Sequence, residues 1–179
     1  MTPISIDHNG MAQGARYIAS PNCDERPADT PVELVVIHNI SLPPREFGGD
    51  GVIALFTNRL DPDVHPYYRE IYQRKVSAHF FIRRDGELIQ FVPCTQRAWH
   101  AGVSQWQGRA NCNDFSIGIE LEGSDDDAFE EVQYQVLNAL LAALRKAYQI
   151  ADIAGHSDIA PGRKTDPGVH FDWARVRNV

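Results

Sequence analysis

Hydrophobic and polar residues follow two different periods along this chain. Residues 32–39 (VELVVIHN) and 115–123 (FSIGIELEG) form short, largely apolar runs, which are typical of buried strands. A third such run ends near residue 155. Between the last two runs, apolar residues recur at helical spacing: Val132, Val136, Leu140, Leu141 and Leu144. This spacing predicts an amphipathic helix from about 130 to 148.

Residues 77–94 give the clearest local signal. Two apolar or alternating runs flank Asp85 and Gly86, a dipeptide typical of a type I′ turn, so this segment predicts a β-hairpin. Residues 52–60 predict a short helix, and a short strand is expected near 97–99. A hairpin pairs its strands antiparallel, whereas a helix can connect two parallel strands. The order of elements therefore predicts an α/β fold with a central mixed β-sheet and helices packed on it.

Length and composition indicate one globular domain over residues 1–179. The chain is 43% hydrophobic and 23% charged, and a chain of this length buries roughly 70% of the surface that its unfolded form exposes. Residues 1–31 are rich in Pro, Asn, Asp and Gly, which predicts a mostly irregular N-terminal lead-in.

Charge and cysteine content disfavour several classes of function. The formal net charge is −7, which disfavours binding to nucleic acid or to an anionic membrane. The three cysteines are odd in number and show no CxxC spacing, so neither a disulfide framework nor a thiolate zinc site is expected. The first 14 residues show no export signal, and no stretch approaches the length of a membrane span. We therefore expect a cytoplasmic protein with no nucleic-acid or membrane partner.

Two histidines end apolar runs, and an aspartate follows the second. His38 closes the first run and His156 closes the last, while Asp166 lies beyond a loop bounded by Pro and Gly. Two imidazoles and a carboxylate suit zinc and leave a fourth position for water, as in catalytic sites. The spacing alone is weak, because a strand-end histidine is more often satisfied within the core.

The strand at 115–123 offers a carboxylate for the same chemistry. Alternation separates its residues into Ile117, Ile119 and Leu121 on one face and Ser116, Gly118, Glu120 and Glu122 on the other. A glycine in mid-strand often marks close approach by another group, which predicts space beside Glu120. A carboxylate there would suit a general base. Alternation does not choose between Glu120 and Glu122, although a solvent-facing position is favoured for Glu122.

Three other residues stand out, each with a plainer alternative. Lys164 precedes Asp166 closely enough to share a cleft and to stabilise an oxyanion, although a lysine is usually a surface residue. Trp99 suits stacking against a sugar, with a rim aromatic as the alternative. His79 lies in the predicted hairpin, where packing in the core or behind the site is favoured.

Five segments together resemble one family: VVIHNISLPPREFGG, SAHFFIRRDGELIQFV, RAWHAGVS, CNDFSIGIELEG and GHSDIAPGRKTDPG…FDWAR. They resemble the zinc-dependent N-acetylmuramoyl-L-alanine amidases, from about residue 17 to 175. More narrowly, they are similar to the bacterial cytosolic AmpD type, which acts on 1,6-anhydro-muropeptides during cell-wall recycling. The resemblance implies a fold shared with amidases and peptidoglycan recognition proteins.

The resemblance also implies roles for the candidate residues. His38, His156 and Asp166 match the zinc ligands. Glu120 matches the catalytic acid and base, which resolves the choice left open above. Lys164 matches the lysine near the substrate carbonyl.

Substrate contacts follow less directly from the resemblance. Asn39 matches a position that lines the substrate site, and Trp99 remains the candidate for the sugar. Some family members carry arginines where this chain has Lys75 and Asn111. Lys75 or the nearby Arg109 is therefore predicted to meet the carboxylate of the stem peptide.

The sequence thus predicts a monomeric zinc amidase whose partner is a small-molecule muropeptide. Three alternatives remain. A phage-type amidase would cut polymeric peptidoglycan. A muropeptide-binding sensor would lack a metal ligand or the base, and all of these are present. A structural zinc site is disfavoured because the fourth ligand position is left open.

Overall fold

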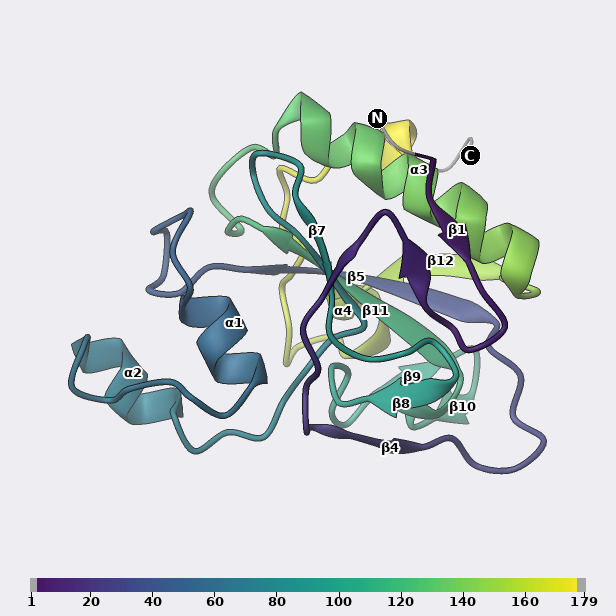
Figure 1. Ribbon diagram of the computed structural model, residues 1–179, viewed down its shortest axis with the longest axis horizontal. Coiled ribbons are helices and arrows are strands. Elements are labelled where there is room, and N and C mark those ends of the chain that lie inside the picture. Colours follow the sequence, from purple (N-terminus) through teal and green to yellow (C-terminus); the bar gives the residue numbers. More distant parts are fainter. Residues whose placement is uncertain (1–2, 177–179) are drawn as a thin grey trace.

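A six-stranded mixed sheet forms the centre of the computed structural model, which describes residues 3–176 (Figure 1). Its strands, in spatial order, are β12 (Asp152–Gly155), β5 (Leu34–Ile40), β11 (Ser116–Glu122), β6 (Phe80–Ile82), β7 (Leu88–Gln90) and β3 (Arg16–Tyr17). The pair β6–β7 is antiparallel and the other neighbours are parallel. The predicted mixed sheet is confirmed.

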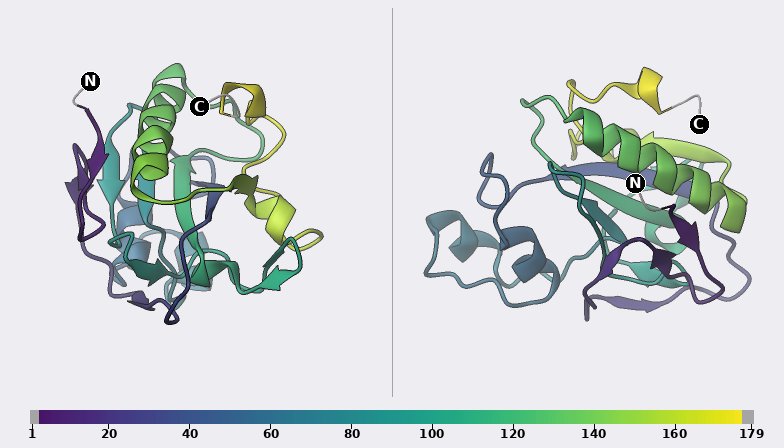
Figure 2. Two further views of the ribbon diagram at one scale, coloured as in Figure 1. Left: turned by 90° about the vertical axis from the view of Figure 1, so that its right-hand side faces the viewer. Right: turned by 45° about the horizontal axis from the view of Figure 1, so that its top comes forward.

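The long helix α3 (Glu131–Ala147) lies across one face of this sheet, as Figures 1 and 2 show. Its apolar stripe packs on the buried side chains that alternate along β5, β11 and β6. Those side chains include Ile117, Ile119 and Leu121, the three residues that alternation placed on one face. The helix predicted from about 130 to 148 is confirmed. Of its predicted apolar residues, Val136, Leu140, Leu141 and Leu144 pack in this core, whereas Val132 is half-buried outside it.

Shortening a side chain in this stripe should destabilise the protein. Leu137 is fully buried between α3 and the sheet. We expect Leu137→Ala to lower the free energy of unfolding by about 2–5 kcal/mol, because it removes apolar contacts and leaves a cavity. Gln135→Ala on the exposed side of the same helix should change it by less than about 0.5 kcal/mol. Urea unfolding of both variants measures the difference, and equal midpoints would contradict this packing.

Two short helices cover the opposite face. α1 (Gly51–Phe56) and α2 (Pro66–Ile71) lie together on the left of Figure 1 and pack against Phe81 and Ile89, which point away from α3. The helix predicted over 52–60 therefore exists but ends early. No helix within residues 3–176 is long and apolar enough to cross a membrane.

The hairpin forms as predicted, but its turn is of another type. A type I′ turn needs positive φ at both central residues, and of Asp85 and Gly86 only Gly86 has it, at +86°. The N–H of Gly86 donates to the Arg83 carbonyl at 2.9 Å, and the backbone N–H of Arg83 donates to the Glu87 carbonyl, also at 2.9 Å. Arg84 therefore belongs to a three-residue loop, and Gly86 takes the left-handed position that closes it.

The lead-in contains more regular structure than its composition suggested. Within the described part of this segment, residues 3–31, the structure contains four short strands: β1 (Ser5–Ile6), β2 (Ala12–Gln13), β3 and β4 (Cys23–Glu25). β3 pairs with β7 and so extends the main sheet, and β4 pairs with β8 (Gln96–Ala98), the short strand expected near 97–99. Strands of two or three residues are too short for alternation to reveal them.

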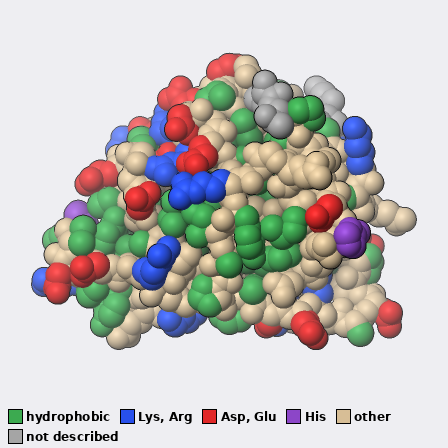
Figure 3. Space-filling model, in the orientation of Figure 1, with side chains coloured by type: hydrophobic (Ala, Val, Ile, Leu, Met, Phe, Trp, Pro, Cys, Tyr) green, Lys and Arg blue, Asp and Glu red, His purple; other side chains and the backbone are tan. Residues whose placement is uncertain are grey.

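Smaller elements complete the described chain: β9 (Gln105–Trp106), β10 (Arg109–Ala110), η1 (Cys112–Asp114), α4 (His156–Ile159) and η2 (Trp173–Arg175). All three cysteines are free, as their number and spacing predicted. On the face drawn in Figure 3, Lys and Arg side chains stand beside Asp and Glu and do not form one continuous basic patch.

Candidate metal centre and active site

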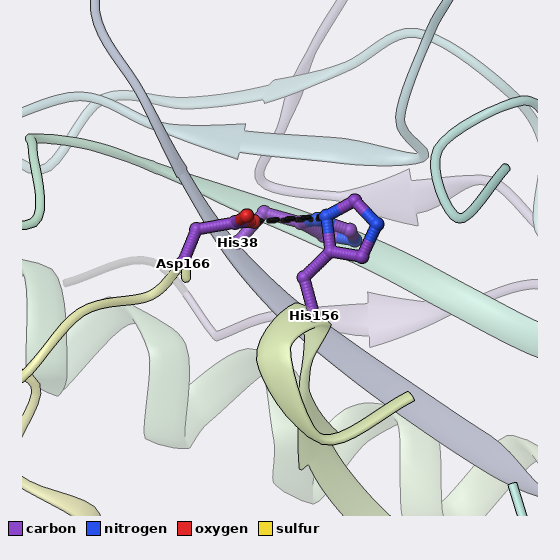
Figure 4. Close-up of side chains that lie close together, drawn as sticks. All are labelled: His38, His156 and Asp166. Atoms are coloured by element: carbon purple, nitrogen blue, oxygen red, sulfur yellow. Dashed lines mark hydrogen bonds and ion pairs between the residues drawn. The ribbon is translucent and has the colours of Figure 1, made fainter. Parts of the chain in front are cut away.

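The parallel register of β12 and β5 brings together the two histidines that end the apolar runs, although β5 continues past His38 to Ile40. Gly155 pairs with Ile37, so His156, at the start of α4, lies beside His38 on β5. The loop after α4 returns to this point, where the Asp166 carbonyl accepts the N–H of Ser157 at 2.9 Å. The carboxylate of Asp166 then points at both imidazoles (Figure 4).

The three side chains offer a compact set of ligand atoms. His38 Nδ1 lies 2.9 Å from His156 Nδ1 and 3.1 Å from Asp166 Oδ2, and His156 Nδ1 lies 3.0 Å from the same oxygen. A tetrahedral zinc ion with bonds of about 2.0–2.1 Å separates its ligand atoms by about 3.3 Å. The observed triangle is nearly equilateral and only slightly smaller, so little movement would admit the ion.

The chemistry of these atoms also suits a cation. His156 Nε2 lies 3.1 Å from the Ala101 carbonyl, which can only accept, so this nitrogen carries the proton and Nδ1 presents a lone pair. Burial raises the pKa of Asp166, but the neighbouring imidazoles of His156 and His38 favour the charged carboxylate, outweigh the effect of burial and hold that pKa well below its usual range. The lone pair of His156 Nδ1 and the charged carboxylate of Asp166 therefore face one another. Imidazole nitrogen and carboxylate oxygen are both ligands that zinc binds in proteins.

His38 is buried in its neutral form. Burial lowers its pKa to about 4, although hydrogen bonding to Asp166 opposes the shift. Neutral imidazole is the form that binds a metal.

Glu120 lies beside the three ligands with one oxygen unused. It is the partner of His38 in the parallel ladder between β11 and β5. Its side chain is buried, and Oε2 has no hydrogen-bond partner among residues 3–176. Burial, followed by the charge of Asp166, raises the pKa of Glu120 well above its usual value, and Lys164 opposes this. A buried carboxylate with a free oxygen suits proton transfer.

Glu122 does not face solvent, contrary to our expectation. Only 3% of it is exposed. One of its oxygens accepts the N–H of Gly48 at 2.6 Å and the other accepts the N–H of Arg84 at 3.0 Å. The 41–51 loop and the hairpin turn cover this end of the sheet face, and alternation cannot report that cover. Because both oxygens of Glu122 are occupied, Glu120 is the better placed of the two as a base.

A pocket of about 550 Å³ opens over these residues. Of the predicted site residues, His38, Asn39, Trp99, Glu120, His156, Lys164 and Asp166 line it. Asn39 donates to an Asp125 carboxylate oxygen at 2.7 Å. The structure thus brings together seven of the nine residues that the sequence analysis assigned to the metal, the catalytic step or the substrate.

Lys75 and Arg109 are not brought to this pocket. Lys75 is exposed, whereas its neighbour Arg74 lines the pocket. Arg109 pairs with Glu33 at 2.7 Å and lies over the ring of Phe115. No periodic pattern in the loop distinguishes Arg74 from Lys75, so the sequence could not have shown which of them faces the pocket.

Gly118 makes room for His100, a residue that sequence reasoning left without a role. A Cβ at Gly118 would lie 2.4 Å from Cγ of His100. His100 Nδ1 in turn lies 2.9 Å from His38 Nε2. The mid-strand glycine correctly signalled close approach by another group, but the space it leaves is filled by this imidazole.

His79 lies behind this region and is fully buried. Its Nδ1 accepts the N–H of Gly118 at 3.0 Å, and its Nε2 lies 3.0 Å from the Gln96 carbonyl. Burial, followed by the charge of Arg26, lowers the pKa of His79 to about 3. This is the packing role predicted for His79.

The buried neutral state of His79 should make stability depend on pH. An unfolded chain protonates this histidine near pH 6.5, whereas the folded chain does so only near pH 3. Between these values the unfolded state holds more protons, so stability falls as pH falls, by about 1.4 kcal/mol per pH unit at most. Urea unfolding of the wild type and His79→Gln at pH 7, 6 and 5 measures this. The destabilisation caused by His79→Gln should shrink toward pH 5, and a constant difference would contradict the expectation.

Comparison with known proteins identifies the family of this chain. Residues 28–169 match the family described as N-acetylmuramoyl-L-alanine amidase. The 1,6-anhydro-N-acetylmuramyl-L-alanine amidase AmpD of Escherichia coli K12 is 59% identical over 170 residues, covering 94% of this chain and 93% of that protein.

Solved structures show the same fold. The crystal structure of a selenomethionine AmpD derivative superposes with a TM-score of 0.94 at 56% identity, covering 97% of each chain. AmiD from E. coli, in complex with anhydro-N-acetylmuramic acid-L-Ala-D-γ-Glu-L-Lys, gives 0.61 at 28% identity, covering 99% of this chain and 66% of that one. The recognition protein PGRP-SA of Apis mellifera shares the fold at 14% identity, with a TM-score of 0.61 over 88% and 91% of the chains. The chain therefore belongs to the N-acetylmuramoyl-L-alanine amidase family and is an amidase of the AmpD type.

Proposed function

We propose that this amidase uses zinc to hydrolyse the bond between the lactyl group of 1,6-anhydro-N-acetylmuramic acid and the L-alanine of the stem peptide. The observation that carries the proposal is the convergence of His38, His156 and Asp166 beside the free oxygen of Glu120. The relative at 59% identity bears the name of this activity.

His38, His156 and Asp166 would hold the zinc ion. Bound zinc would supply Lewis acidity, which makes a water molecule more acidic and polarises the amide carbonyl. Two neutral imidazoles and one carboxylate leave room for the reactants beside the ion.

In this proposal Glu120 transfers the proton, and Lys164 stabilises the negative charge that develops on the carbonyl oxygen. Oε2 of Glu120 accepts a proton from the attacking water while the new C–O bond forms at the lactyl carbonyl. The ammonium of Lys164 stabilises the oxyanion of the tetrahedral intermediate. As the C–N bond breaks, Glu120 returns the proton to the departing amine of L-alanine. The products are a carboxylic acid and a free peptide amine.

Two residues of the pocket lining are candidates for contact with the sugar end of the substrate. We propose that Asn39 and Trp99, which both line it, contact the anhydro-muramyl group. Lys75 and Arg109 lie outside the lining, so they would meet only a stem peptide that extends beyond the pocket.

Turnover of a soluble anhydro-muramyl tripeptide, compared with release of peptide from intact sacculi, tests this function. We expect the soluble substrate to be cleaved faster, cleavage to stop when a chelator removes the metal, and zinc to restore it. Preference for sacculi would favour the phage-type alternative. Full turnover by metal-free protein would overturn the metal-assisted mechanism.

We further propose that the chain is a single domain that acts as a monomer in the cytoplasm. These proposals rest on its length and on the resemblance to the cytosolic enzymes. Sedimentation at micromolar concentration and fractionation of cells that express the protein would test them. A dimer, or enrichment outside the cytoplasm, would require revision.

A further inference from the structure

We propose that one short loop segment, His100 with Ala101, orients both metal-binding histidines. His100 holds His38 through its side chain, and Ala101 holds His156 through its carbonyl. The inference rests on the proposed function, because it takes His38 and His156 as metal ligands.

A chain of hydrogen bonds fixes which nitrogen of His38 carries the proton. Ser116 Oγ donates to the Cys112 carbonyl at 2.5 Å, so its only proton is used. The same Oγ must therefore accept from His100 Nε2, which lies 3.2 Å away. His100 Nδ1 is then unprotonated and accepts from His38 Nε2 at 2.9 Å. His38 Nδ1 is left with its lone pair directed at His156 and Asp166.

Strand β11 leaves space for the His100 ring that links these hydrogen bonds. Gly118 lies between Ser116 and Glu120 on the same face of β11, and any Cβ there would collide with the His100 ring. His79 accepts the N–H of Gly118 at 3.0 Å, and its ring lies beside that of His100, with the ring centroids 5.8 Å apart. The sheet thus supplies both the space for His100 and the acceptor, Ser116, that orients it.

The second half of the segment acts through its backbone. The Ala101 carbonyl accepts from His156 Nε2 at 3.1 Å and also from Arg163 at 2.6 Å. Asn113 Oδ1 accepts the N–H groups of both His100 and Ala101, at 3.1 and 2.8 Å. Asn113 and Arg163, from two other segments, therefore fix the position of His100 and Ala101, which in turn bind His38 and His156.

Fixed partners of this kind matter because a histidine ligand must present a chosen nitrogen in a chosen direction. Loss of such a partner typically weakens metal binding about 10–100-fold. His100 is therefore a positioning residue, and its removal should be visible in metal affinity before any substrate is added.

The test compares His100→Phe with His100→Asn. Phenylalanine fills the space but accepts no hydrogen bond, whereas asparagine keeps an acceptor near the position of Nδ1. Competition with a chromogenic chelator gives the zinc dissociation constant. We expect His100→Phe to bind zinc about 10–100-fold more weakly and His100→Asn to recover most of that loss. His170→Phe, at an exposed position, is the matched control and should bind like the wild type.

A spectroscopic measurement separates orientation from general damage. The ¹⁵N shifts of His38 in metal-free protein report its tautomer, which should be Nε2-protonated in the wild type and mixed in His100→Phe. If that variant fails to fold, Ser116→Ala removes the acceptor behind His100, together with the bond to the Cys112 carbonyl, and should weaken zinc binding several-fold. Wild-type affinity in folded His100→Phe, or in Ser116→Ala, would overturn the inference. A wild-type protein that does not bind zinc would instead overturn the proposed function.

Discussion

Replacing Glu120 by glutamine should abolish nearly all turnover while zinc remains bound. General acid–base catalysis by a positioned side chain contributes about 10²–10⁴-fold to rate, and glutamine cannot accept the proton. The same variant should be at least as stable as the wild type. The buried carboxylate has a free oxygen and a raised pKa, so its charged form is disfavoured in the fold and glutamine removes that charge. Steady-state kinetics with the soluble muropeptide, zinc titration and thermal unfolding measure the three quantities.

Glu122→Gln is the matched control on the same strand. It should keep the chemical step, because both oxygens of Glu122 are bound to backbone N–H groups. It should instead lower the free energy of unfolding by about 1–3 kcal/mol, because an amide nitrogen would face one of those donors. Substantial activity in Glu120→Gln, or an inactive but stable Glu122→Gln, would reverse the roles proposed for the two glutamates.

Asp166→Asn should weaken zinc binding more than any variant outside the three ligands. Partners behind a ligand are worth about 10–100-fold in affinity, so loss of the ligand's own charge should exceed about 100-fold. The activity of Asp166→Asn should fall in proportion to its loss of bound metal and should recover partly at high zinc concentration. The activity of Glu120→Gln should not recover when zinc is added. Chelator competition and kinetics over a zinc series make this comparison.

Asp126→Asn gives a control of equal charge change. Asp126 is exposed and lies 3.7 Å from Arg45, so its loss should leave zinc affinity unchanged. Equal affinities for Asp166→Asn and the wild type would remove Asp166 from the metal site.

The sequence predicted what depends on periodic patterns and on motifs. Apolar runs predicted the strand that carries His38 and the strand that ends just before His156, and helical spacing predicted α3. The resemblance supplied the choice of Glu120, which alternation alone left open. The structure places these side chains around one point.

What the sequence did not predict depends on contacts between distant segments. Alternation told which face Glu122 occupies but not that two loops cover that face. The dipeptide at the hairpin turn did not show that Arg84 joins the loop. Gly118 showed that something approaches the strand, yet only the fold shows that it is His100. The position of Arg74, rather than Lys75, in the pocket lining likewise depends on the path of an irregular loop.

The ladder between β5 and β11 separates what must stay constant in this enzyme from what can vary. His38 and Glu120 face each other as backbone partners in the middle of the sheet, so their spacing is inherited from strand pairing. Much of the pocket rim comes instead from the 41–51 loop and from the segment around α2. Insertions and substitutions in those segments can therefore remodel substrate choice during evolution without retuning the reacting groups. The same division makes the two segments natural places to graft new specificity onto an unchanged hydrolytic centre.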